Sequence, residues 1–424
     1  MFFIFIFTFV QLILFSLFTM PISEDGEVLF IVINSLFVAA FLRLKYPKYF
    51  LLFMIGYFLR IALLAIDYGT AFPVLHSGAD TEMFHRIASE NALKGNYDRQ
   101  LTNYTIILTW LYILLGECRL IAQYINVLFG MGVLVYLAKT FETLDLNEKL
   151  KKKALLIAVL FPHLIIFSGI LLREVWVQFF VVISLFYFVR WLKHNRIGLL
   201  LLTVISVLAA SWMHAGTLLV TVGYLIAFAF YYPKLEKSKV SFGAVITLCF
   251  LILGSIVFLT FTDVFTDKFN SFELGTLQEY GLHNVVVHGG ESAYLTWINP
   301  NSPFQLLLFS PLKMFYFLFS PIPLDWRGLQ DVIAFFLDAV IYLFLIYTTL
   351  KYYGKLENGM KKNILKYLLI AVFFSVFVFA YGTTNAGTAI RHRCKIFSLV
   401  LTAYAVSVSE KKKYRTYYLQ NQSP

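Results

Sequence analysis

Long uninterrupted apolar runs are the feature that most constrains how this chain of 424 residues can fold. Many of these runs approach the length of about 20 residues that a helix needs to cross the hydrocarbon core of a bilayer. Hydrophobic residues make up 59% of the chain and charged residues only 14%. Backbone groups in lipid must be hydrogen-bonded internally, and runs without polar alternation do not fit a β-barrel. The sequence therefore predicts an all-α, polytopic integral membrane protein.

The basic residues between the runs predict the orientation of the chain. Clusters such as Lys151, Lys152 and Lys153 fall on alternate connections, and cytoplasmic loops carry an excess of Lys and Arg. This alternation predicts about twelve spans in a single transmembrane domain, residues 1–424, with both termini in the cytoplasm. The basic residues of these cytoplasmic loops then account for the net charge of +11, so no nucleic-acid partner is expected. We place the spans near residues 1–20, 27–43, 49–66, 119–140, 154–171, 174–191, 197–212, 215–232, 242–261, 331–350, 364–381 and 395–409.

Two apolar segments do not fit as crossings. Residues 104–115 are too short, and a span at 304–320 would break the charge alternation. Both are predicted to be re-entrant or interfacial helices on the outer face, beside two large outer loops at 67–103 and 262–303. The first run has no basic residues before it and is interpreted as a retained span. The three cysteines show no metal spacing, and neither a disulfide framework nor a metal site is predicted.

The remaining ionisable residues gather on the predicted outer face. Charges beside a bilayer need a partner, water or a chemical role. Several of them also have a simple structural interpretation. Arg173 and Glu174 can form an ion pair in a turn, and His214 can be a hydrogen-bonded histidine in a turn. Asp80 can cap the N-terminus of a helix expected at 81–93, with Glu82 as an acidic residue of its first turn. The candidate site residues are Asp80, Glu82, His85, Arg86, Arg173, Glu174, His214, Arg327, Arg391, Arg393 and Lys395.

This pattern of charges favours one chemistry. Arg391, Arg393 and Lys395 lie outside against the positive-inside bias, and guanidinium groups grip phosphate in a bidentate manner. A carboxylate on the same face can deprotonate or orient an acceptor hydroxyl while cations stabilise a departing phosphate. Sugar transfer from a polyprenyl-phosphate donor needs both groups. The chain has no Gly-rich nucleotide-binding motif, and no cofactor is expected.

The same residues resemble the GT-C superfamily of polyprenyl-phosphate-dependent glycosyltransferases. The similarity covers residues 50–200 and, less fully, 385–405. It rests on Asp80-Thr81-Glu82-Met83-Phe84-His85-Arg86-Ile87-Ala88 with Gly95-Asn96-Tyr97, on Asn126 with the segment from Phe161-Pro162-His163 to Arg173-Glu174, and on Arg391-His392-Arg393. The resemblance implies that Asp80 is the catalytic or acceptor-orienting carboxylate, that Arg391 and Arg393 bind phosphate, and that Arg173 and Glu174 support the cavity rim. More than one span precedes the Asp80 loop, where that family usually has one.

The chain is also similar to O-antigen and exopolysaccharide polymerases, so single-sugar transfer and repeat-unit polymerisation both stay open. The expected partners are a polyprenyl-(pyro)phosphate-linked saccharide donor, a glycan acceptor and the lipid bilayer. The expected location is the bacterial inner membrane, with the active site facing the periplasm or exterior. The alternative function is a flippase of lipid-linked oligosaccharide. Against it, no internal repeat is visible between the two halves.

Overall fold

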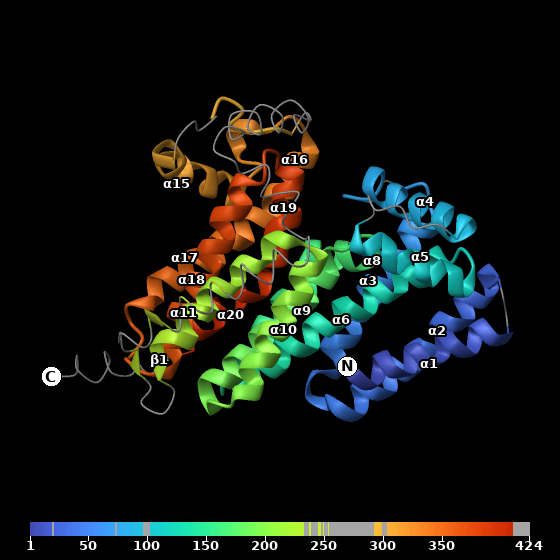
Figure 1. The fold of residues 1–424 in the computed structure, drawn as a ribbon, viewed down its shortest axis with the longest axis horizontal. Coiled ribbons are helices and arrows are strands. Elements are labelled where there is room, and N and C mark those ends of the chain that lie inside the picture. Colours follow the sequence, from blue (N-terminus) through green and yellow to red (C-terminus); the bar gives the residue numbers. More distant parts are fainter. Residues whose placement is uncertain are drawn as a thin grey trace. The chain divides into compact units, whose positions relative to one another are not determined.

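The computed structural model describes residues 1–18, 21–72, 74–95, 102–232, 237–238, 292–298 and 303–409, with the single positions 245, 246, 249 and 253. Within these residues the regular secondary structure is helical, except for the antiparallel two-residue strands β1 (Tyr231–Tyr232) and β2 (Lys237–Ser238) and an isolated bridge between Ala293 and Asn385 (Figure 1). The prediction of an all-α protein is therefore confirmed. The outer loop predicted at 262–303 lies outside the described residues except at 292–298, and so does most of the span predicted at 242–261.

Six helical segments of the described residues are long and apolar enough to cross a membrane. The membrane character of the chain is supported, and the count of twelve crossings stays a prediction. The six segments are α2 (Glu24–Lys45), η1 (Pro47–Tyr49) with α3 (Phe50–Gly69), α6 (Arg119–Thr143), α9 (Glu174–His194), α16 (Leu329–Ala334) with η6 (Phe335–Ala339) and α17 (Val340–Tyr353), and α18 (Met360–Tyr381).

Shorter helices account for the other apolar runs. The segment predicted as a span at 154–171 is broken at Phe161, because Pro162 starts a new helix at its first position. The two segments predicted as interfacial form helices of 13 and 17 residues. The shorter helices are α1 (Phe2–Phe18), α4 (Ala79–Lys94), α5 (Asn103–Leu115), α7 (Glu148–Leu160), α8 (Pro162–Gly169), α10 (Ile197–Met213), η2 (Ala215–Leu219), α11 (Val220–Phe230), α15 (Pro303–Phe319), η5 (Pro323–Asp325), α19 (Ala386–Lys395) and α20 (Phe397–Val408).

The helices form two compact units, whereas the sequence suggested one membrane domain. The first unit contains residues 1–138 and 152–179, and the second contains residues 139–151 and 180–424. Each unit has its own core and is described by itself.

Polar side chains link the helices of the first unit. The Asn34 amide donates to Thr8 Oγ1 and Gln11 Oε1, both at 2.9 Å, and its carbonyl accepts from the Tyr124 hydroxyl at 3.0 Å. All of these side chains are buried. Hydrogen bonds of this kind hold helices together in apolar surroundings, where burial alone supplies little driving force. They join α1 and α2 to α6.

Asn126 of α6 fixes the chain that precedes α9. Its amide donates to the carbonyl oxygens of Ile170 and Leu172 at 2.7 and 3.0 Å, and its own carbonyl accepts from Trp176 Nε1 at 2.7 Å. A non-helical segment buried among helices needs partners for its backbone groups, and Asn126 supplies them. The turn just before Arg173 and Glu174 is therefore held in one conformation.

The second unit is a bundle in which α17 and α18 both pack on α20, and α11 packs on α18 (Figure 1). Gly223 of α11 permits the last contact, because a Cβ atom there would lie 2.6 Å from both the Ala371 Cβ atom and the Tyr367 carbonyl oxygen. In the long helix from Leu329 to Tyr353, residues 335–339 adopt π-helical hydrogen bonding. Such single-turn widenings often occur at functional sites.

Candidate functional site

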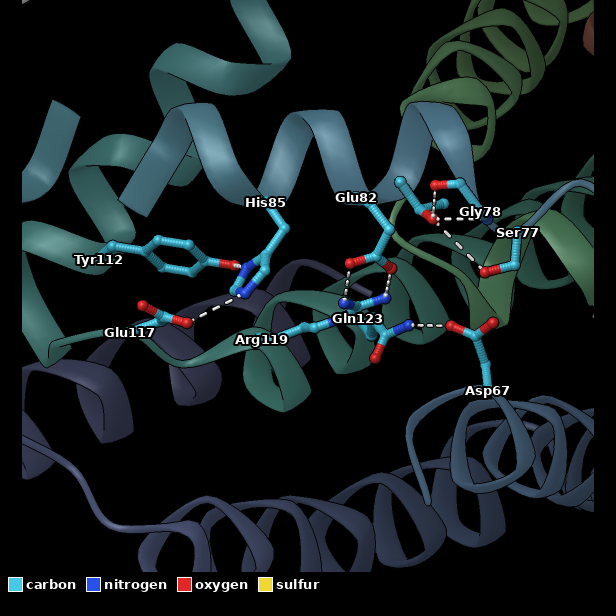
Figure 2. A network of polar contacts seen from close by, with 10 residues as sticks. Asp67, Ser77, Gly78, Glu82, His85, Tyr112, Glu117, Arg119 and Gln123 are labelled. Atoms are coloured by element: carbon cyan, nitrogen blue, oxygen red, sulfur yellow. Dashed lines mark hydrogen bonds and ion pairs between the residues drawn. The ribbon is translucent and has the colours of Figure 1, made fainter. Parts of the chain in front are cut away.

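A network of polar contacts fastens α4 to the start of α6 in the first unit (Figure 2). The Arg119 guanidinium donates to both carboxylate oxygens of Glu82, at 2.9 and 2.6 Å. Further along α4, the two ring nitrogens of His85 contact the Tyr112 hydroxyl at 2.9 Å and Glu117 Oε1 at 3.0 Å. Because a paired guanidinium and carboxylate fix both distance and orientation, the rotation of α4 about its axis is defined.

The first turn of α4 is set by Gly78 and Thr81. Gly78 has φ of 127° and ψ of −117°, a conformation that side-chain-bearing residues rarely adopt. The Thr81 hydroxyl accepts from the Gly78 amide and donates to the Gly78 carbonyl, both at 2.9 Å. Asp80 lies in this turn and is half-buried. Its negative charge is favourable at a helix N-terminus. The helix expected at 81–93 is confirmed, with its start two residues earlier.

Acidic residues also surround the first turn of α6. Glu27 of α2 is buried, and its carboxylate accepts from the Ile121 amide at 2.9 Å, as a capping group from another helix would. Asp67, at the end of α3, accepts from Gln123 Nε2 at 2.6 Å (Figure 2). Neither Glu27 nor Arg119 was among the predicted site residues. The available signal was that each is an ionisable residue at the end of an apolar run.

The electrostatics of the network assign charge states to two of the predicted site residues. The hydrogen bond from Arg119 lowers the pKa of Glu82, so this carboxylate is ionised at neutral pH. Burial, followed by the nearby positive charge of Arg119, lowers the pKa of His85, although Glu117 and Glu82 act in the opposite direction. His85 is therefore neutral at neutral pH. In that state one ring nitrogen donates to Glu117 and the other accepts from Tyr112.

These contacts separate the predicted site residues of α4 into two groups. Glu82 and His85 are bound to neighbouring helices and hold α4 in place. Asp80 lies two residues before Glu82 in the same first turn, and Arg86 is exposed. At the other end of the first unit's chain, Arg173 is half-buried and Glu174 is buried in the first turn of α9.

The second unit brings together two of the predicted site residues, His214 and Lys395, around one aromatic ring. The ring centroid of His214 lies 5.8 Å from that of Phe379, and the Lys395 ammonium lies 5.9 Å from the same ring. His392 joins them, with its ring centroid 4.8 Å from His214 and its Nδ1 atom 3.1 Å from the Thr383 hydroxyl. His392 and Phe379 were not among the predicted site residues, although His392 stands between the two arginines of the predicted phosphate motif.

Arg393 does not fit the role of a phosphate ligand that the sequence suggested. Its side chain is fully buried, and Nε pairs with the buried carboxylate of Asp338. The other two nitrogens donate to the carbonyl oxygens of Phe317 and Ser320 at 2.9 and 2.7 Å. With every guanidinium nitrogen engaged inside the bundle, Arg393 joins α15, α19 and the π-helical turn. Arg391, two residues earlier, is only half-buried.

Arg327 also has a local structural partner. Its guanidinium donates to both carboxylate oxygens of Asp331, at 3.0 and 3.2 Å, and its backbone amide donates to one of them. This ion pair links the chain just before α16 to the first turn of that helix. Among the described residues, no group of three or more His, Cys, Asp or Glu side chains is placed to hold a metal ion.

No protein-family model, no curated protein and no solved structure matches this chain. An assignment of activity therefore depends on the residues and contacts described above.

Proposed function

We propose that this protein is a membrane glycosyltransferase of bacterial surface-polysaccharide assembly. It would transfer a sugar or oligosaccharide repeat unit from a polyprenyl-(pyro)phosphate donor to a glycan acceptor at the outer face of the inner membrane. The observation that carries this proposal is the fixed α4 helix. A polar helix between the apolar helices α3 and α5 is fastened by Glu82 and His85, so that Asp80 has a defined place in the first turn.

In the proposed reaction, Asp80 accepts the proton of an acceptor hydroxyl. The hydroxyl oxygen attacks the anomeric carbon of the donor sugar and forms the new glycosidic C–O bond. The bond from that carbon to the phosphate oxygen breaks, and the phosphate leaves with the electron pair. A positioned carboxylate contributes general-base catalysis, typically about 10²–10⁴-fold in rate.

The leaving phosphate needs positive charge, which we assign to Arg391, one of the two arginines that the GT-C resemblance implies as phosphate ligands. Groups of this kind stabilise the charge that develops on the phosphate in the transition state. Arg393 takes part only indirectly in this proposal, because its donors are engaged with Asp338 and two carbonyl groups. Glu82 and His85 are positioning residues for α4.

A strain that lacks the gene and is complemented with single variants tests the proposal. Asp80→Asn should abolish long surface polysaccharide at normal membrane levels of the protein, because an amide cannot accept the acceptor proton. Glu90→Gln, on the exposed face of the same helix, is the matched control and should leave the polymer unchanged. Wild-type polymer from Asp80→Asn would refute the catalytic assignment. The strain without the gene also separates the two forms of the activity, since retained single repeat units indicate a polymerase.

One observation favours the alternative of a flippase. The Asp338–Arg393 pair is buried, and Asp338 lies inside a helical segment long enough to span. Ionisable pairs within membrane helices often belong to transport pathways. The location of accumulated lipid-linked saccharide in the deletion strain distinguishes the two functions. Intermediates accessible to an added glycosidase from outside indicate a missing transferase, whereas protected intermediates indicate a missing flippase.

A further inference from the structure

A groove of about 470 Å³ lies on the second unit, on a part of the chain that the proposed reaction does not use. Ile346 and Thr349 of α17 line one side, and Ile370 and Phe373 of α18 line the other. Val400 and Ala403 of α20 line it as well, the helix on which both walls pack. The lining is almost entirely apolar, so the groove suits a hydrocarbon chain.

The two ends of the groove differ in charge. At one end the lining includes Tyr353 and Lys366, near residues 354–359 that join α17 to α18. The stretch 351–366 contains five lysines and one acidic residue, Glu357. The opposite end is lined by Met314 and Leu318 of α15 and by Val376. The groove is therefore apolar along its length, and its one charged lining residue in the described part of the chain, Lys366, belongs to this lysine-rich stretch.

The length of the groove matches one leaflet of a bilayer. Its lining on α18 extends from Lys366 to Val376, which is roughly 15 Å of helix at 1.5 Å per residue. The hydrocarbon core of a bilayer is about 30 Å thick. A ligand with one chain of leaflet length and an anionic head group is complementary to this site in both shape and charge.

We propose that this groove binds one acyl chain of an anionic phospholipid, with its phosphate on Lys366 and the neighbouring lysines. Basic pockets at the cytoplasmic ends of membrane helices recognise anionic head groups in this way. The lysine-rich connection is one that the charge pattern places in the cytoplasm, whereas a polyprenyl-phosphate donor would present its phosphate at the outer face. The lipid site is thus independent of the proposed transferase site.

Binding of single lipids to the purified full-length protein, measured by native mass spectrometry, tests this proposal. The probes are phosphatidylglycerol, phosphatidylcholine and undecaprenyl phosphate. Phosphatidylglycerol should bind most tightly. Lys366→Gln should weaken it about fivefold, since one lysine near an anionic head group contributes that much, and should weaken phosphatidylcholine binding less, because choline offsets the phosphate charge of that lipid. Lys152→Gln, an exposed lysine on α7, is the matched charge control and should have no effect.

A second variant tests the groove independently of charge. Ile346→Trp fills the groove and should remove saturable phosphatidylglycerol binding, whereas Leu343→Trp, exposed on the same helix, should not. If Ile346→Trp does not give a monodisperse protein, phosphatidylglycerol binding by Lys366→Gln is the test of the proposal. Equal affinities for the two phospholipids, or unchanged binding by Lys366→Gln, would overturn the proposal. Tighter binding of undecaprenyl phosphate at this groove would overturn the assignment of a phospholipid as its ligand.

Discussion

Single ionisable side chains in this protein differ in what surrounds them, and the surroundings decide what each one can do. Arg393 was predicted to bind phosphate and Arg327 to bind substrate, yet each pairs with an aspartate. The Arg393–Asp338 pair is fully buried, whereas the Arg327 side chain is 37% exposed. Removing one partner of a buried pair leaves an uncompensated charge, but an exposed pair contributes little. The two pairs therefore predict different responses to the same substitution.

Asp338→Asn should destabilise the protein by about 3–5 kcal/mol, because it leaves the buried Arg393 charge without its counter-ion. Asp331→Asn, the matched change at the exposed pair, should cost about 1 kcal/mol or less. Thermal unfolding of the purified variants in detergent measures both effects. If Arg393 were instead a solvated ligand for phosphate, the two variants would unfold at the same temperature.

His85 and Glu82 predict how stability depends on pH. The pKa of His85 in the folded protein is below its ordinary value of 6.5. As the pH falls, His85 is therefore protonated in the unfolded chain before it is protonated in the folded protein. The His85 contribution is fully present above pH 6.5 and is lost as the pH falls through the lower folded pKa. Glu82, whose pKa is below 4.5, adds a second contribution that is present above pH 4.5 and is lost at still lower pH.

His85→Gln should therefore flatten the dependence of the melting temperature on pH just below 6.5. The fall of the melting temperature below pH 4.5, which Glu82 causes, should remain. Melting curves collected from about pH 8 to about pH 4 cover both ordinary pKa values. His194→Gln, at an exposed histidine on α9, is the control and should keep the parent profile. An unchanged slope in His85→Gln would show that the histidine does not control this transition.

Among the helices, apolar run length predicted where most elements lie, because a membrane-length run can satisfy its backbone only as a helix. It did not predict the π-helical turn at 335–339 or the separation of α19 from α20 at Ile396. Asp338 lies within the π-helical turn and pairs with Arg393, and a pairing between residues 55 positions apart leaves no periodic trace in the sequence. The start of α4 was predicted to within two residues from its acidic first turn.

The backbone at Gly78 gives a prediction about α4 as an element. Nothing lies within 4 Å of a Cβ atom built there, so Gly78→Ala meets no steric obstacle from neighbours. Its φ of 127° is nevertheless strained for alanine, at a cost of about 1–3 kcal/mol. Gly69→Ala, also in open space but without positive φ, isolates this effect.

Gly78→Ala should lower the melting temperature and reduce polymer formation, since it shifts the turn that carries Asp80. Gly69→Ala should leave polymer formation unchanged and should not lower the melting temperature, because alanine is a better helix former than glycine. Normal polymer from a destabilised Gly78→Ala protein would show that the position of the first turn of α4 is not critical for activity.

For the whole molecule, the sequence predicted the class, a helical membrane protein. It did not predict which residues pair with one another in the candidate site. The residues of α4 were recognised because ionisable groups are rare among apolar runs. Their contacts were not, because Glu82 pairs with Arg119 37 positions away and Arg393 pairs with Asp338 55 positions away. Pairings at such separations depend on how helices pack, which composition and spacing do not specify.

The orientation of the molecule in the membrane is the prediction on which the proposed activity depends most. The charge pattern places α4 outside and the basic start of α7 inside. Single cysteines at positions 90 and 152, both exposed, report on the two sides once Cys118, Cys249 and Cys394 are replaced by serine or alanine. In intact cells, an impermeant thiol reagent should label Glu90→Cys and should label Lys152→Cys only after the membrane is permeabilised. The reverse pattern would place Asp80 in the cytoplasm, where nucleotide-sugar donors are available and a polyprenyl-linked donor at the outer face would no longer be required.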